Sequence, residues 1–202
     1  MPFGPDGVGH RQLASVLDPI HATVDDPSPL QHAAVLGLIL SQAQIRTDSR
    51  LLLIQRAKAG GTHAGQLAFP GGKPEKGDDS LVSTALREAE EEIFLDTNTV
   101  QVLGRLEPVP TPTGFLIVPF IGLAHTRWEP SRHNEEVERI LTPTFGKLAN
   151  PEIHSITAQR TWRGKTWELH RFDIADPPLW GATARMVWDL LQRMRSLHQR
   201  SS

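Results

Sequence analysis

The sequence predicts an α/β protein in which a mixed β-sheet is covered by helices on both sides. Three observations predict this fold class: strand-like segments spread along the chain, an acidic helix near its middle and an amphipathic helix near its end. Each helix has one apolar face, and such faces are buried against a sheet in layered domains. With 202 residues, the chain is long enough for one sizeable domain, or for one domain with an appended element.

Composition narrows the classes of function. A hydrophobic fraction of 39% and a charged fraction of 22% are those of a globular protein. The formal net charge of −2 leaves no basic footprint, so we expect no nucleic-acid partner. With no cysteine, disulfides, thiolate metal sites and a cysteine nucleophile are excluded. The chain has no apolar run long enough for a membrane span and no signal-peptide pattern at its start, which predicts a cytoplasmic protein without a membrane partner.

The first thirty residues read as an N-terminal extension, and residues 31–198 as the main domain. The extension begins with a loose segment rich in proline and glycine. A short helix is expected at His10–Leu17, where Leu13, Val16 and Leu17 share one side. Three prolines within residues 18–30 then predict an irregular connection.

Strand-like segments follow in the main domain. Ala33–Leu40 and Leu51–Ile54 are continuous apolar runs separated by a polar turn, and we interpret them as a buried hairpin, with a short helix as the alternative. Further strands are expected at Val100–Leu106, Phe115–Leu123, Val137–Leu141, Ile153–Trp162 and Thr166–Ile174. A turn at Arg163–Gly164 would join the last two, Pro143–Asn150 suits a short helical turn, and Ala182–Leu197 is the amphipathic C-terminal helix.

The acidic helix carries two chemically different sides. Its apolar side contains Leu81, Ala85 and Ala89 at helical spacing, while Glu88, Glu91 and Glu92 project from another side. Asp78 or Asp79 is the expected N-cap. A helix built this way can pack on a sheet and still present carboxylates as ligands.

The electrostatics of this helix call for a cation. Carboxylates three or four residues apart repel by roughly 0.2–0.5 kcal/mol per pair. Those near a helix C-terminus oppose the macrodipole by roughly 0.3–1 kcal/mol each. Arg87 alone is too little to offset both effects, and Mg²⁺ prefers such oxygen ligands together with phosphate oxygens. The alternative is a solvated acidic face without a ligand.

Residues Gly72–Leu95 resemble the Nudix box, G-x5-E-x7-R-E-U-x-E-E-x-G-U. The second half matches as Arg87–Glu92, whereas the interval from Gly72 to Arg87 is one residue longer than usual. Asp78 or Asp79 fills the acidic position, and Phe94 stands in place of the second glycine. The resemblance implies a Nudix α/β/α sandwich with a mixed sheet, a central acidic helix and a C-terminal amphipathic helix.

The segment before the box resembles the coenzyme A (CoA) pyrophosphatase branch, L-L-T-x-R-[SA]-x3-R-x3-G-x3-F-P-G-G. The matching positions are Leu52, Leu53, Arg56, Ala57, Gly65, Phe69, Pro70, Gly71 and Gly72. Ile54 replaces a threonine and Gly61 replaces an arginine. The lost arginine bears on the substrate, because the 3′-phosphate of CoA suits a guanidinium. Asn134–Val137 and Trp180–Ala184 are also similar to this branch.

The resemblance also implies roles for individual residues. Glu88, Glu91, Glu92 and the carbonyl of Gly71 would hold Mg²⁺ or Mn²⁺, and water would attack phosphorus in line. Glu88 and Glu136 are both candidates for the general base, and Arg87 would orient the glutamates. The residues expected to contact the substrate are Arg56, Gly65, Phe69 and Gly72.

The leading hypothesis is hydrolysis of CoA or acyl-CoA to 3′,5′-ADP and (acyl-)4′-phosphopantetheine. One alternative is a Nudix hydrolase for ADP-ribose or a dinucleotide, and another is a binding module without catalysis. Family likeness and unallocated tryptophans predict a homodimer. Trp162, Trp167, Trp180 and Trp188 could stack on an adenine but are better explained by packing, and His63 by a surface role than by a phosphate contact.

Overall fold

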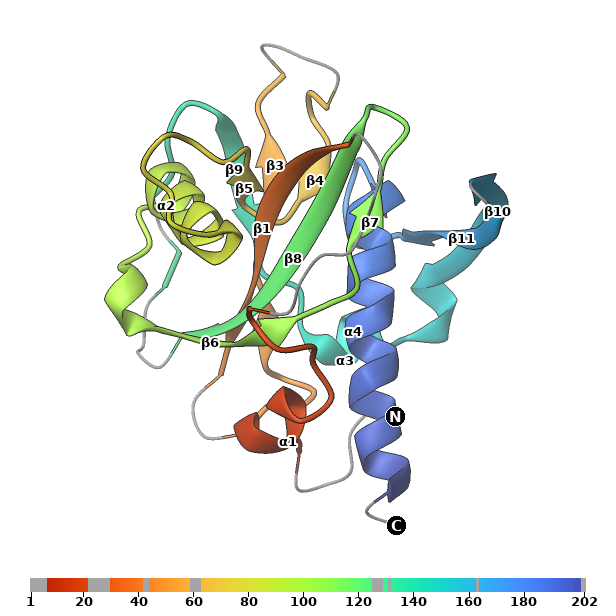
Figure 1. The fold of residues 1–202 in the computed structure, drawn as a ribbon. Coiled ribbons are helices and arrows are strands. Elements are labelled where there is room, and N and C mark those ends of the chain that lie inside the picture. The colour runs from red at the N-terminus through yellow and green to blue at the C-terminus, as the bar shows by residue number, and fades with distance from the viewer. Residues whose placement is uncertain are drawn as a thin grey trace.

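A computed structural model describes residues 7–21, 30–41, 44–58, 63–124, 129–130, 132–162 and 164–200. The acidic helix α2 (Leu81–Ile93) and the C-terminal helix α4 (Gly181–Arg200) lie on opposite sides of the main sheet (Figure 1). The predicted sandwich of helix, mixed sheet and helix is therefore confirmed. Within the described residues, no helix is both long enough and apolar enough to cross a membrane.

The main sheet is built around one long parallel pair. Its strands are β1 (Gln31–Leu40), β2 (Arg50–Leu51), β5 (Gly71–Gly72), β6 (Val100–Arg105), β7 (Val109–Pro110) and β8 (Phe115–Ala124). β1 runs parallel to β8 from Gln31 opposite Phe115 to Leu40 opposite Ala124. The other pairings in this sheet are antiparallel, which makes the sheet mixed.

Two three-stranded sheets flank the main sheet. One contains β4 (Leu67–Ala68), β3 (Leu53–Arg56) and β9 (Val137–Leu141), in that order. The other contains β10 (His154–Trp162), β11 (Lys165–Phe172) and β12 (Leu179–Trp180), and its first two strands form the hairpin that extends beside α4 in Figure 1. The remaining elements are α1 (His10–Ala14), η1 (Thr97–Thr99), α3 (Phe145–Leu148) and η2 (Pro151–Ile153).

Alternation along β1 divides the core between the two helices. Leu36 and Leu38 lie in the cluster that contains Ala85 and Ala89 of α2. Ile39 lies in the other cluster, with the buried face of α4. Because successive strand residues point to opposite faces, one strand holds α2 and α4 in a fixed relation. The acidic residues of α2 lie outside both of these apolar clusters.

The predicted hairpin is correct only at its base. Leu51 pairs with Ile39, and Arg50 pairs with Leu40. Beyond Leu52 the chain enters the sheet of β4, β3 and β9, where Leu53 pairs with Leu141 of β9. The run Leu51–Ile54 is buried throughout. A strand buried on both faces shows no alternation from which its partner could be inferred.

Two predicted helix starts and ends are wrong in detail. The N-cap of α2 is Ser80, whose hydroxyl accepts from the amide of Ser83 at 3.3 Å, rather than Asp78 or Asp79. Serine satisfies free helix amides as well as aspartate does. The first helix ends at Ala14 instead of Leu17, although Leu17 is still buried. Most of the loose start and of the irregular connection, residues 1–6 and 22–29, lies outside the described residues.

Candidate active site

Three of the four glutamates of α2 are candidate metal ligands, and they have very different surroundings. The side chain of Glu92 is 2% exposed and that of Glu88 is 17% exposed, whereas Glu91 is 55% exposed. Burial of an anion is costly unless cations or hydrogen-bond donors surround it. The helix therefore carries a graded set of acids, from a buried one to a solvated one.

Glu92 is held by one main-chain amide and one arginine. Its Oε2 accepts from the amide of Gly71 at 2.9 Å, and its Oε1 accepts from Nη2 of Arg56 at 3.1 Å. Burial nevertheless raises the pKa of Glu92 to about 7, against the lowering effects of Arg56 and the Gly71 amide. Glu88 and Glu136 raise it further. This carboxyl group lacks sufficient positive charge for its position.

The two glycines before the helix allow close approach of the backbone. Gly71 has φ of 150°, and a Cβ there would collide with the main chain of Ala34 and Val35. A Cβ at Gly72 would occupy the space of the Glu88 carboxylate. The absence of side chains thus brings the Gly71–Gly72 strand directly onto both β1 and the acidic side of α2.

Arg87 braces the acidic side through five hydrogen bonds. Nε and Nη2 donate to the two oxygens of Asp78 at 3.0 and 3.1 Å. Nη1 donates to Glu91 at 3.0 Å, while Nη2 also donates to Glu88 at 3.2 Å and to the carbonyl of Lys73 at 3.1 Å. The expected orienting role of Arg87 therefore has a structural counterpart. Asp78, and not Asp79, fills the acidic position of the motif.

Thr84 completes this brace, and sequence reasoning missed it. Its hydroxyl donates to Oδ2 of Asp78 at 2.8 Å, and its side chain is fully buried. Nothing in the sequence distinguishes this threonine from an ordinary residue of the helix. Its role follows only from the loop that carries Asp78 back onto the first turn of α2.

Glu88 and Glu136 form a second pair of interest. Burial raises the pKa of Glu88, Arg87 opposes that effect, and the charges of Glu91 and Glu136 add to it. Glu136 is exposed, and its main chain is fixed by the Ala57 amide, which donates to its carbonyl at 2.8 Å. The adjoining segment is tied to α2 where the Asn134 amide donates to the Glu92 carbonyl at 2.9 Å. The structure thus brings both candidate bases to one site.

Phe94 keeps the helix exit of a glycine. It adopts the left-handed conformation, with φ of 52° and ψ of 40°, as the C-cap of α2. Glycine favours this conformation at helix ends. The ring is 49% exposed and lies 5.1 Å from the guanidinium of Arg132. The backbone at this helix exit is therefore one that glycine would also adopt.

The residues expected at the substrate divide into two groups. Arg56 and Gly72 border the acidic side of α2, and Gly65 forms the turn that holds the main chain of Arg56. Phe69 is 1% exposed in the core, where its ring faces Gly37. A substrate contact from Phe69 would therefore involve its main chain. Gly61, the position of the missing arginine, lies outside the described residues.

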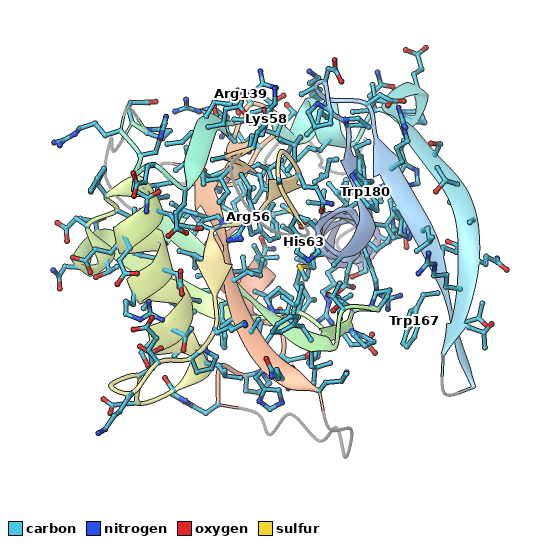
Figure 2. All side chains as sticks on the ribbon, turned by 90° about the horizontal axis from the view of Figure 1, so that it is seen from above. Arg56, Lys58, His63, Arg139, Trp167 and Trp180 are labelled. Atoms are coloured by element: carbon cyan, nitrogen blue, oxygen red, sulfur yellow. The ribbon has the colours of Figure 1, made fainter. Side chains whose placement is uncertain are left out.

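Trp167 and Trp188 lie away from this site. Trp167 and Trp188 line a cavity of about 560 Å³ between β11 and α4, together with Arg185 and Gln192. Figure 2 shows Arg56 and Trp167 on opposite sides of α4 in that view. Trp188 stacks on His154 with the ring centroids 4.2 Å apart, and Trp180 is 52% exposed. The chemistry of the carboxylates, rather than this cavity, identifies the candidate site.

The oxygen donors fit a hard divalent cation in type but are not gathered into a finished site. Among the described residues, no three acidic or histidine side chains are grouped at metal-binding geometry. Arg56 forms an ion pair with Glu92, and Arg87 forms ion pairs with Glu88 and Glu91. The raised pKa of Glu92 indicates that this carboxylate would be stabilised by more positive charge. The Gly71 carbonyl, which shares the Arg56 guanidinium with Glu92, supplies a second oxygen, so the two groups together could accept an additional cation.

The fold and the acidic site together define an α/β protein whose acidic helix faces a double glycine. In agreement, the NUDIX domain family matches residues 30–170. The Nudix hydrolases NudL of Yersinia pestis (strain Pestoides F) and of Yersinia pseudotuberculosis (serotype O:1b) are each 36% identical over 165 residues, covering 81% of this chain and 80% of each relative. The chain belongs to the Nudix hydrolase family.

Solved structures agree on the fold. The Nudix hydrolase RenU of M. smegmatis has a TM-score of 0.52 at 16% identity, over 85% of this chain and 88% of RenU. A MutT/nudix family protein from Enterococcus faecalis has a TM-score of 0.50 at 16% identity, over 88% of this chain and 65% of that protein. At these identities the likeness concerns the architecture alone.

Proposed function

We propose that this Nudix hydrolase cleaves the diphosphate bond of CoA or acyl-CoA, giving 3′,5′-ADP and (acyl-)4′-phosphopantetheine. The observation that carries the proposal is the position of Arg56, which belongs to the CoA-branch motif and contacts both Gly71 of that motif and Glu92 of the Nudix box. Residues of the two motifs therefore meet at one guanidinium group. That convergence supports a site in which the CoA-branch residues serve the acidic helix.

Glu88, Glu91, Glu92 and the Gly71 carbonyl would hold Mg²⁺ or Mn²⁺. When bound, the ion would neutralise charge on the diphosphate and lower the pKa of water. Arg87 would keep Glu88 and Glu91 in place through charge-assisted hydrogen bonds. Gly72 would let the Glu88 carboxylate lie directly against β5, because a Cβ at this position would collide with it.

Either Glu88 or Glu136 would take the proton from water. Oε1 of Glu88 accepts from Arg87, and within the described residues Oε2 has no hydrogen-bond donor, so Oε2 is available as a base. Glu136 is exposed, and its charge acts on both Glu88 and Glu92. Loss of a general base lowers the rate by about 10²–10⁴-fold. Comparing kcat of Glu88→Gln and Glu136→Gln across pH would assign the role, because only the true base sets the acidic limb of the profile.

Gly61 favours a second candidate function, hydrolysis of ADP-ribose or a dinucleotide. A CoA-specific site would use a guanidinium for the 3′-phosphate, and the chain has glycine at that motif position. The test is a substrate panel with Mg²⁺, containing CoA, acetyl-CoA, ADP-ribose, NADH and nucleoside triphosphates. The CoA proposal predicts the highest kcat/KM for CoA or acetyl-CoA. Brisk cleavage of ADP-ribose without CoA turnover would contradict it.

A binding module without catalysis is a weaker candidate, because a binder has no need of three clustered carboxylates with an arginine brace. A homodimer also remains a proposal. Ile156 and Trp180, in the sheet of β10, β11 and β12, are 48% and 52% exposed. Large apolar side chains of this kind are common at interfaces. Sedimentation velocity would give the mass of the particle directly.

A further inference from the structure

One guanidinium nitrogen of Arg56 contacts two of the oxygens proposed as metal ligands. Nη2 donates to the carbonyl of Gly71 at 3.1 Å and to Oε1 of Glu92 at 3.1 Å. The other oxygen of Glu92 accepts from the Gly71 amide at 2.9 Å. Arg56 thus provides the positive charge between a buried carboxylate and a main-chain carbonyl.

Arg56 and Arg87 differ in how firmly they are held. The main chain of Arg56 is fixed, since its amide donates to Gln66 and its carbonyl accepts from Gly65, both at 3.0 Å. Its guanidinium contacts only Gly71 and Glu92 among the described residues, and the side chain is 34% exposed. Arg87 is bound at both oxygens of Asp78 and at a carbonyl as well. The guanidinium of Arg56 can leave its position while that of Arg87 stays.

A divalent ion and a guanidinium cannot share these two oxygens without strong repulsion, because both would lie within a few ångström in a partly buried site. We propose that Arg56 is a stand-in cation, which Mg²⁺ or Mn²⁺ displaces from Glu92 and the Gly71 carbonyl, and that the released guanidinium then binds a phosphate of the substrate. This inference rests on the proposed function. It deepens that function by coupling metal loading to substrate binding.

The displaced guanidinium has a suitable target. Its main-chain anchor keeps it beside the acidic side of α2, where a diphosphate would lie, and its exposed fraction gives it a path toward solvent. Guanidinium groups bind phosphate oxygens in pairs with good geometry. The metal-loaded protein is therefore expected to bind the substrate more tightly than the metal-free protein does.

Binding of Mn²⁺ to the substrate-free protein, measured by calorimetry, tests the competition. Removing a competing cation should tighten metal binding, so Arg56→Gln should lower the Kd for Mn²⁺ at least about threefold, and Arg56→Lys should lie between the two. The same Arg56→Gln variant should melt at a lower temperature in EDTA. Equal or weaker Mn²⁺ binding by Arg56→Gln would overturn the proposal, because an arginine that merely orients Glu92 would assist the metal.

Arg139→Gln is the matched control. Arg139 lies on the neighbouring strand β9, and its guanidinium donates to Gln55 at 2.6 Å and to the Asp176 carbonyl at 2.9 Å instead of to the acidic helix. Its Kd for Mn²⁺ should equal that of the unaltered protein. A similar tightening in both variants would mean that overall charge, and not displacement of Arg56, governs metal affinity.

Arginine side-chain NMR gives a second readout that does not depend on affinity. The Nε–Hε signal that disappears in Arg56→Lys should shift on addition of Mg²⁺, while the signal of Arg87 should change less. A fixed Arg56 signal at saturating Mg²⁺ would overturn the displacement even in an active enzyme. Failure of the proposed function has a different signature, namely no cleavage of CoA or acetyl-CoA by a protein whose Mn²⁺ binding and Arg56 signal still behave as described here.

Discussion

Arg87 forms a bidentate ion pair with Asp78, in which Nε lies 3.0 Å from Oδ1 and Nη2 lies 3.1 Å from Oδ2. This contact holds the pKa of Asp78 well below its usual range and raises that of Arg87. The contact therefore favours the charged form of both side chains. It fixes the guanidinium that in turn faces Glu88 and Glu91.

Asp78→Asn should lower kcat while the protein remains folded. Partners that orient the ligands of a metal site typically contribute about 10–100-fold in affinity or activity, and we expect a loss in that range. Asp79→Asn is the matched control, since the adjacent acid has no hydrogen bond to Arg87. Steady-state kinetics with saturating Mg²⁺ would measure both. Equal losses in the two variants would contradict the brace.

The two glycines of β5 should respond differently to alanine. Gly71→Ala would force a Cβ into the main chain of Ala34 and Val35 at a positive φ, and we expect it to lower the free energy of unfolding by at least about 2 kcal/mol. In Gly72→Ala the nearest atoms to the new Cβ belong to the end of the Glu88 side chain, which can rotate. That variant should keep its stability within about 1 kcal/mol. Urea denaturation would distinguish the two.

Gly72→Ala should nevertheless be a poor enzyme. Its Cβ displaces the Glu88 carboxylate from the position it holds against β5, and a displaced catalytic carboxylate costs about 10²-fold or more in kcat. A stable Gly72→Ala variant with full activity would show that the position of Glu88 against this strand is unimportant.

Phe94 carries a backbone conformation that suits glycine. A left-handed conformation costs about 1–2 kcal/mol in a residue with a Cβ, and Phe94 adopts it with its ring half exposed. Phe94→Ala keeps that cost and loses the ring contact with Arg132, whereas Phe94→Gly relieves it. The free energy of unfolding of the glycine variant should therefore be about 1 kcal/mol higher than that of the alanine variant. Equal stabilities would contradict the assigned conformation.

His170 should make stability depend on pH. Burial, the neighbouring His154 and Arg185 of α4 lower its pKa to about 4, and Glu168 of β11 lies 4.0 Å away. The depressed value means that the unfolded chain binds the additional proton first. Stability is then complete above the unfolded value of about 6.5 and falls as the pH drops toward 4.

From these pKa values the loss between pH 7 and pH 5 is about 2 kcal/mol. His170→Gln should remove most of it, and His63→Gln, an exposed control, should not. Urea denaturation at the two pH values measures this directly. A pH dependence that is unchanged in His170→Gln would contradict burial of the neutral imidazole.

Periodicity was sufficient for most of the fold. Val137–Leu141 is a strand with the predicted bounds, and the C-terminal helix begins one residue earlier and ends three residues later than predicted. Partner strands were harder to predict. The parallel pairing of β1 with β8 joins residues more than eighty positions apart, and neither run carries a signal for its neighbour.

The acids, the glycines and Arg87 of the candidate site could be named from the sequence, but the contact between Arg56 and Glu92 could not. The sequence indicates Glu88, Glu91 and Glu92 because they place like charges at helical spacing. The contact of Arg56 with Glu92 depends on how the sheet of β3, β4 and β9 packs beside the main sheet, and no local sequence pattern encodes that packing. The choice between Asp78 and Asp79 likewise depends on the path of one loop.

The most direct test of the account follows CoA hydrolysis by ³¹P NMR in the presence of Mg²⁺, with Glu92→Gln beside the unaltered protein and Glu90→Gln as an exposed control on the same helix. We expect the diphosphate signals to give way to two new phosphomonoester signals, EDTA to stop the reaction, and Glu92→Gln to lose about 10³-fold or more in rate while Glu90→Gln does not. Undiminished cleavage by Glu92→Gln, or cleavage that continues in EDTA, would contradict a metal-dependent site on α2.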